Sequence, residues 1–254
     1  MAVRLSPVAG LAEKAGAQFA ERRGWREVVS YSQVAAEAVI ELNGAAIADE
    51  SANGKLLLEG AEAASVLQLA LGRIPSALTA GVEASAGYPA NPTGGLRTAS
   101  TPAPYTESGT ALEGEPPPLG NGSPIDGGSA YRLRPDLFFL SLPPSEERQM
   151  LEKLEAAARR SGHFVTATDI TDGRFEFRLI GPDARELLGR FCALDFHPDS
   201  FPNHGARQTL VAKVPALVIR RDLGGLPAFS LIGARSLGAY LWEVLVHGGR
   251  PPVE

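Results

Sequence analysis

Residues 79–129 limit the fold of this chain more than any other segment, because they hold almost no large aliphatic side chains. The segment reads TAGVEASAGYPANPTGGLRTASTPAPYTESGTALEGEPPPLGNGSPIDGGS and is crowded with Gly, Pro, Ser, Thr and Ala. Such a composition cannot bury enough apolar area to offset the entropy lost on ordering. We predict a long flexible insertion with extended Pro-rich parts, which serves either as a linker or as a segment that a partner orders.

The insertion divides the chain into an N-terminal α+β part, residues 1–78, and a C-terminal α+β part, residues 130–250. The 254 residues are 44 % hydrophobic and 21 % charged, which is typical of a globular protein with a sizeable core. We expect the two parts to form one composite domain.

Local patterns in the N-terminal part predict two helices and two strands. The first helix lies within SPVAGLAEKAGAQFAERRG, with Ser6 as its cap and Pro7 as its first residue. The other predicted elements are strands at 36–42 and 55–60 and a helix over 61–72.

The C-terminal part carries stronger signals. Residues 145–162 predict a helix that Ser145 caps and Gly162 ends. Phe175, Phe177 and Leu179 alternate along a strand and should share one buried face. The other predicted elements are two short strands, or one kinked at Pro135, over 131–144, strands at 163–170, 174–180, 210–221 and 226–233, and a helix over 234–248. A further helix within 179–201 should bury one stripe, formed by Ala184, Leu187, Leu188 and Phe191.

Two of these elements carry specific expectations. Pro215 should force the strand at 210–221 to an edge position or a bulge, because Pro lacks a backbone N–H. The helix over 234–248 should end at Gly248 and bury one stripe, formed by Leu237, Tyr240, Leu241, Val244 and Leu245. The order of elements mixes hairpins with crossovers, which predicts an α+β fold with mixed or antiparallel sheets rather than a doubly wound parallel sheet.

Charge and cysteine content exclude several classes of function. A net charge of −5 and a pI near 5.5 argue against a nucleic-acid or anionic-membrane partner. The single cysteine excludes an internal disulfide and fits a reducing compartment. No stretch of about 18 apolar residues exists, and the N-terminal residues lack the apolar core of a signal peptide. We expect a cytoplasmic protein.

The segment LIGPDARELLGRFCALDFHPDSF, residues 179–201, concentrates reactive residue types. Asp183 should lie at the start of a helix, where a carboxylate compensates free N–H groups. Cys192 should lie at the helix exit, where the dipole disfavours a thiolate, so a small buried hydrophobe is the better interpretation. Glu186 and Arg190 form an (i, i+4) pair typical of a solvated ion pair.

The four histidines do not have the spacing of metal ligands. His197 and His204 are seven residues apart, and Asp195 and Asp199 lie beside them, so a metal site is conceivable there, but loop Asp and His residues more often form solvated turns. His247 should serve as a favourable charge at a helix end. The chain has no P-loop, no GxGxxG between strand and helix and no G-x-S-x-G elbow. We predict no catalytic, cofactor-binding or metal-binding residues.

The second half nevertheless resembles a known family. GPDAR followed by CALDFHP, then ARQTLVAKVPALVIRR and PAFSLIGARSLGAYLWEVL, is similar to the pattern of sarcosine oxidase gamma subunits. RLRPDLFFLSLPP and the opening RLSPVAGLAEKAG also resemble that family, although Arg134 stands where the family has Gly and Leu137-Phe138 where it has Glu-Trp. The resemblance covers most of residues 131–247 well and the N-terminal third loosely, and the insertion matches nothing.

The resemblance implies the fold of the folate-binding domain of glycine-cleavage aminomethyltransferases. Those enzymes carry an essential Asp on the strand that corresponds to AKVPALVIRR, and here that region has Lys213 and no acidic residue. The resemblance therefore implies a non-catalytic gamma subunit of a heterotetrameric flavoenzyme that oxidatively demethylates sarcosine. FAD, FMN, NAD and tetrahydrofolate would bind to the partner alpha, beta and delta subunits, and this chain would pack mainly on alpha.

Two alternatives stay open from the sequence. The shared fold is compatible with a stand-alone folate-dependent one-carbon transferase. A gamma-like subunit of a complex that oxidises N-methylglutamate or dimethylglycine is the other, because substrate contacts would lie on another chain.

Overall fold

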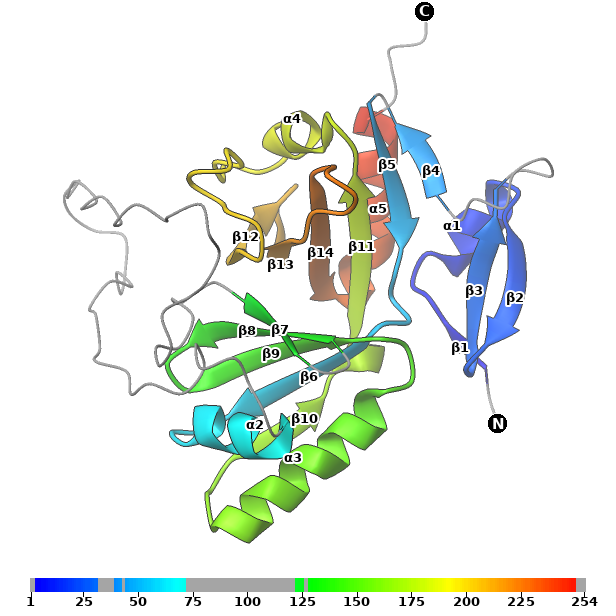
Figure 1. Cartoon of the computed structure of the whole chain (residues 1–254). Helices are drawn as coiled ribbons and strands as arrows, with labels where there is room; N and C mark the ends of the chain where they lie inside the picture. The colour runs from blue at the N-terminus through cyan, green and yellow to red at the C-terminus, as the bar shows by residue number, and fades with distance from the viewer. Residues whose placement is uncertain (1–2, 32–38, 43, 72–121, 126–127, 250–254) are drawn as a thin grey trace, which may run out of the picture.

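The computed structural model describes residues 3–31, 39–42, 44–71, 122–125 and 128–249 (Figure 1). Most of the predicted insertion at 79–129 lies outside the described residues, namely 79–121 and 126–127. Residues 72–78, which precede it, also lie outside them. The last residues of that segment differ from the expectation, since Gly122–Ile125 forms strand β7 and strand β8 begins at Gly128. The described residues form three sheets and their covering helices, an α+β fold as predicted.

The smallest sheet lies near the N-terminus and has the strand order β1-β3-β2. Its elements are β1 (Arg4–Leu5), α1 (Ala9–Lys14), β2 (Gln18–Arg22) and β3 (Trp25–Ser30). The sequence predicted only the helix here. Arg23 and Gly24 join β2 to β3 with positive φ values of 51° and 77°, the geometry that favours tight hairpins. The helix itself begins at Ala9, so Ser6 and Pro7 precede it.

The second sheet has the order β10-β6-β9-β8-β7 and carries two helices on one face (Figure 1). Its elements are β6 (Gly54–Glu59), α2 (Ala63–Leu71), β7, β8 (Gly128–Arg134), β9 (Leu137–Leu142), α3 (Glu147–Ser161) and β10 (Thr166–Asp169). Leu58, Phe138 and Leu140 pack against Leu67 of α2 and Leu154 of α3 in one buried cluster. The two-strand alternative for residues 131–144 is confirmed, because β8 and β9 form a hairpin around Pro135.

The third sheet has the order β12-β13-β14-β11-β5-β4. Its elements are β4 (Val39–Leu42), β5 (Ala45–Asp49), β11 (Arg174–Ile180), β12 (Ala206–Val211), β13 (Val214–Arg220) and β14 (Ala228–Ala234), with helices α4 (Ala184–Gly189) and α5 (Gly238–Gly249) and 3-10 turns η2 (Thr171–Gly173) and η3 (Arg235–Leu237). Phe175, Phe177 and Leu179 are fully buried in the cluster that includes Leu188 of α4 and Trp242 of α5. The predicted face of β11 is confirmed.

The second and third sheets pack against each other through their remaining faces. Tyr131 and Phe139 from one sheet share a buried cluster with Leu217, Ile219 and Ile232 from the other. The body is therefore layered helix, sheet, sheet, helix (Figure 1). The inner strands β9 and β13 bury apolar side chains on both faces. This explains the nearly continuous apolar letters of LFFLSL and VPALVIR.

One predicted strand is in fact a hairpin. The segment 210–221 contains the end of β12, a turn at Ala212 and Lys213 with φ of 48° and 68°, and β13. The expectation for Pro215 was wrong, since β13 is an interior strand. Its pairing with β14 begins only at Ala216, so the missing N–H of Pro215 removes no bond from that ladder.

Helix boundaries also differ from the predictions at three points. Ser145 does not cap α3, since its φ is 69° and its hydroxyl donates a hydrogen bond to the Arg23 carbonyl at 3.1 Å. The left-handed exit at Gly162, φ 70°, is confirmed. Helix α5 starts at Gly238 after a 3-10 turn and ends at Gly249, which shifts its apolar stripe. Leu237 and Tyr240 are consequently exposed, while Trp242 is buried.

Candidate functional site

The segment 179–201 runs from the end of β11 through α4 into an exit loop. Gly181 makes the turn between strand and helix with φ 140°, and a Cβ there would lie 2.7 Å from the Ala45 Cα atom. This close approach to the backbone of β5 requires glycine. Asp183 follows at the N-cap of α4, and its backbone N–H donates to the Gly44 carbonyl at 3.0 Å. Its carboxylate forms no capping hydrogen bond, so only its predicted position is confirmed.

Cys192 lies in the core, as predicted. Only 6 % of the residue is exposed, and it belongs to the same apolar cluster as Leu188 and Trp242. The Sγ atom lies 3.6 Å from the Thr209 hydroxyl. Cys192 therefore packs in the core as a small hydrophobic side chain would.

The exit loop after Cys192 is organised by Asp195. Its carboxylate accepts hydrogen bonds from the Ser200 hydroxyl at 2.5 Å and from the His197 backbone N–H at 2.9 Å, and these bonds lower the pKa of Asp195. His197 Nδ1 lies 3.4 Å from an oxygen of the exposed Asp199. The arrangement is that of a hydrogen-bonded turn.

His204 stands apart from this turn. Its backbone has φ 63° and donates to the Arg220 carbonyl at 2.9 Å. Burial of the ring and the nearby Arg221 charge lower the pKa of His204. Within the described part of the chain, no group of three or more His, Cys, Asp and Glu side chains is arranged to hold a metal ion.

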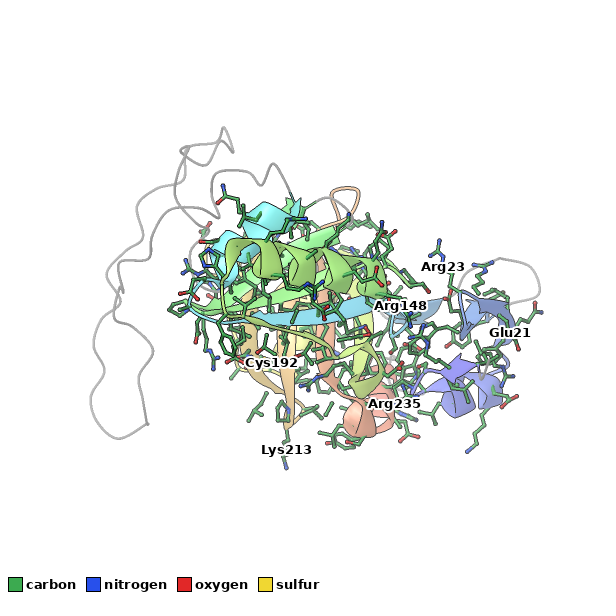
Figure 2. All side chains as sticks on the ribbon, turned by 90° about the horizontal axis from the view of Figure 1, so that it is seen from below. Glu21, Arg23, Arg148, Cys192, Lys213 and Arg235 are labelled. Carbon is green, nitrogen blue, oxygen red and sulfur yellow. The ribbon has the colours of Figure 1, made fainter. Side chains whose placement is uncertain are left out.

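The other sequence candidates lie on the surface. Arg190 donates to Glu186 at 3.0 Å in the predicted exposed (i, i+4) pair. His247 sits in the last turn of α5 with its Nδ1 atom 2.7 Å from the Glu243 carbonyl oxygen. Lys213 occupies the β12–β13 turn and points outward from the body (Figure 2). None of the helices in the described ranges is long and apolar enough to cross a membrane.

A cavity of about 270 Å³ lies between the second and third sheets. Its walls are mainly apolar and include Leu57, Phe139 and Ile232. Pro215 and Ala216 also line it, and they belong to the AKVPALVIRR segment, which contains no acidic residue. Its polar lining consists of Arg174, Gln208 and Thr209, with no carboxylate among the described residues. Such a cavity can hold an apolar group but offers no acid or base beside it.

A family model identifies the class of protein. The chain belongs to the family described as the GCVT N-terminal domain, which matches residues 120–252.

Two solved structures share the fold over almost the whole chain. One is the heterotetrameric sarcosine oxidase from Corynebacterium sp. U-96 in complex with pyrrole 2-carboxylate: TM-score 0.62, 17 % identity, covering 99 % of this chain and 99 % of that one. The other is glycine cleavage system aminomethyltransferase T from Bartonella henselae: TM-score 0.66, 18 % identity, covering 96 % of this chain but only 57 % of that one. A comparison with curated protein sequences finds no match.

Sequence reasoning missed one group of polar residues that the fold brings together. Glu50, Ser129, Arg178 and Arg221 line a second cavity, yet they come from four distant segments. No spacing rule connects such positions before the sheet order is known.

Proposed function

We propose that this chain is a non-catalytic, gamma-type subunit of a heterotetrameric sarcosine-oxidase-type flavoenzyme. Its role is structural, and its main contact is the large alpha subunit. The complex would oxidatively demethylate sarcosine, and FAD, FMN, NAD and tetrahydrofolate would bind to the alpha, beta and delta subunits.

The observation that carries this proposal is the mutual coverage with one chain of a heterotetrameric sarcosine oxidase. The match includes 99 % of both chains, whereas the aminomethyltransferase match includes 57 % of the enzyme. The resemblance of GPDAR and CALDFHP to gamma subunits, noted from the sequence, supports the same assignment.

The chemistry of the apolar cavity favours a structural role. A folate-dependent methyl transfer needs a group that binds and polarises the pterin or moves a proton. Pro215 and Leu217 instead present a ring and an isobutyl group to that space. Thr209 and Gln208 are neutral at all working pH values, and Arg174 is a permanent cation.

Affinity capture tests the proposal. The chain is co-expressed with the alpha, beta and delta chains of a sarcosine oxidase, with the tag on alpha, and an unrelated protein of similar size serves as the control prey. We expect stoichiometric capture of this chain and none of the control. Recovery of this chain as a free monomer, together with a fully active complex formed without it, would falsify the assignment.

The structural similarity to an aminomethyltransferase supports a second candidate, a stand-alone folate-dependent one-carbon transferase. This candidate requires saturable binding of tetrahydrofolate to the isolated chain, which calorimetry measures directly. We expect no binding heat. A complex that acts on N-methylglutamate or dimethylglycine remains the third candidate, and substrate turnover by the captured complex distinguishes it from sarcosine oxidation.

A further inference from the structure

A polar cavity of about 410 Å³ lies at the junction of the second and third sheets. Glu50 and Asn53 line it from the β5–β6 connection and Ser129 from the start of β8. Arg178 lines it from β11, and Arg221 lines it from the position directly after β13. It shares no lining residue with the apolar cavity. Its walls combine two guanidinium groups, one carboxylate, an amide and hydroxyls, which is the composition of a polar ligand site.

Arg178 is held in place but not saturated. Its Nη2 atom donates to the Arg221 carbonyl at 3.0 Å, and its Nη1 atom lies 3.6 Å from a Glu50 oxygen. Its Nε atom is buried and has no hydrogen-bond partner in the described part of the chain. Since buried N–H groups are almost always paired, the cavity lacks an acceptor beside this guanidinium.

Arg221 adds a second positive charge to the same space. Its charge partly offsets the burial that raises the pKa values of the Glu50 carboxyl and the Tyr131 hydroxyl. Among the described residues, no side chain accepts a hydrogen bond from its guanidinium. Two arginines with spare donors are suited to a planar oxyanion, which they bind with paired N–H groups.

The charged side chains around the polar cavity favour an anionic ligand, although one of them is the Glu50 carboxylate. Behind the wall, Lys55 and Glu176 neutralise each other as an ion pair at 3.2 Å. Glu50 is committed to Arg178 and to the Asn53 amide, which donates to it at 3.2 Å. Two guanidinium charges against one carboxylate leave a net positive charge facing the cavity, and one bound carboxylate would balance it.

We propose that this cavity binds a small carboxylate-bearing molecule, whose carboxylate lies between Arg178 and Arg221. The site is independent of the proposed subunit role, since it requires only the residues of this chain. Ser129 and Ser141 line the cavity beside the arginines and suit a ligand with further polar groups.

Calorimetry on the full chain tests the site with sodium acetate as probe, at an ionic strength held constant with sodium chloride. Inorganic phosphate is titrated in a separate arm. Arg221→Gln should weaken acetate binding about tenfold or more, because it removes charge-assisted hydrogen bonds. Arg178→Gln should do the same. The control Arg159→Gln removes an equal charge from the exposed surface of α3 and should leave the affinity unchanged.

Glu50→Gln should change the affinity for acetate in the opposite direction. Removing the one negative charge on the wall should strengthen acetate binding by about threefold to tenfold. A merely water-filled, structural cavity predicts no such pair of opposite shifts. Because Arg221 is partly exposed and forms no ion pair with the described residues, its variant keeps the test valid even if Arg178→Gln fails to fold. Absence of saturable acetate binding, equal affinity in Arg221→Gln, or tighter binding of phosphate than acetate would each overturn the proposal.

Discussion

Lys55 on β6 and Glu176 on β11 form a fully buried ion pair that joins the second and third sheets. The Nζ and Oε2 atoms lie 3.2 Å apart, and both side chains have 0 % exposure. Lys55 also donates to the carbonyls of Ser51 and Asn53, at 3.3 and 2.7 Å. The Glu176 backbone N–H donates to the Ser51 hydroxyl at 3.1 Å. Among the described residues neither Glu176 carboxylate oxygen accepts a hydrogen bond, so the Lys55 charge is the main compensation for this buried carboxylate.

This pair predicts a strong asymmetry between single and double substitution. Glu176→Leu alone leaves the Lys55 ammonium buried and unpaired, which should cost about 3–5 kcal/mol of unfolding free energy. Lys55→Met combined with Glu176→Leu should recover most of that loss, since the double variant buries no charge. Urea denaturation of the three proteins measures this.

The exposed Glu155–Arg159 pair on α3 is the matched control for the buried one. Breaking it should cost less than about 1 kcal/mol, because solvent screens both charges. A loss of similar size in Glu176→Leu and in Glu155→Gln would contradict the account of the sheet junction.

Glu50 predicts an unusual pH dependence of stability. Burial, and then the nearby Glu176 charge, raise the pKa of Glu50 above its usual value of 4.5. Above pH 4.5 the folded state therefore binds more protons than the unfolded state, so this group's contribution is full below that pH and is lost as the pH rises through the folded pKa. Burial raises the pKa of Asp49 too, so Asp49 changes the stability with pH in the same direction.

Glu50→Gln isolates this contribution. The unfolding free energy of the variant relative to the natural chain should rise between pH 4.5 and pH 8, as measured by urea denaturation at each pH. Glu186→Gln, on the exposed face of α4, is the control and should give a flat difference. A difference for Glu50→Gln that falls over this range would show that its carboxylate is stabilised, not penalised, in the fold.

Cys192 should behave as a core side chain and not as a nucleophile. A thiol that is 6 % exposed reacts with a disulfide reagent mainly when the surrounding structure opens. We expect slow labelling of the native chain that accelerates with urea in step with unfolding. Cys192→Ala should keep full incorporation into the proposed complex, and rapid labelling under native conditions would place the thiol on the surface instead.

Two glycines of the 179–201 segment should respond to alanine with opposite signs. Gly181→Ala puts a Cβ 2.7 Å from the backbone of Ala45 at φ 140°, and should cost about 2 kcal/mol or more. Gly189→Ala meets nothing within 4 Å and lies in the last turn of α4, so it should stabilise by about 0.5 kcal/mol. Thermal denaturation compares the two variants. Equal midpoints would show that the short distance between residue 181 and the Ala45 backbone does not require glycine.

The sequence correctly predicted the features that depend on interactions between residues close in the chain. The alternation of Phe175, Phe177 and Leu179 and the left-handed exit at Gly162 depend on neighbours within a few residues. The β2–β3 hairpin was missed because Arg23-Gly24 lies among charged residues without alternation. The β12–β13 hairpin was missed because the positive φ of Ala212 and Lys213 carries no sequence signal.

The polar cavity could not be predicted for a different reason. Glu50, Arg178 and Arg221 become neighbours only because β5, β11 and β13 enter one sheet and β8 and β9 pack beside it. Pairing between strands that are more than a hundred residues apart is a property of the whole fold.

The most direct test of the central claim, that this chain is an assembly subunit without catalytic groups of its own, is native mass spectrometry of the co-expressed complex. We predict one copy of this chain in each complex with alpha, beta and delta, and a mass loss of 26.7 kDa when it is omitted. A complex of unchanged mass in its presence and absence, with this chain recovered free, would contradict the claim.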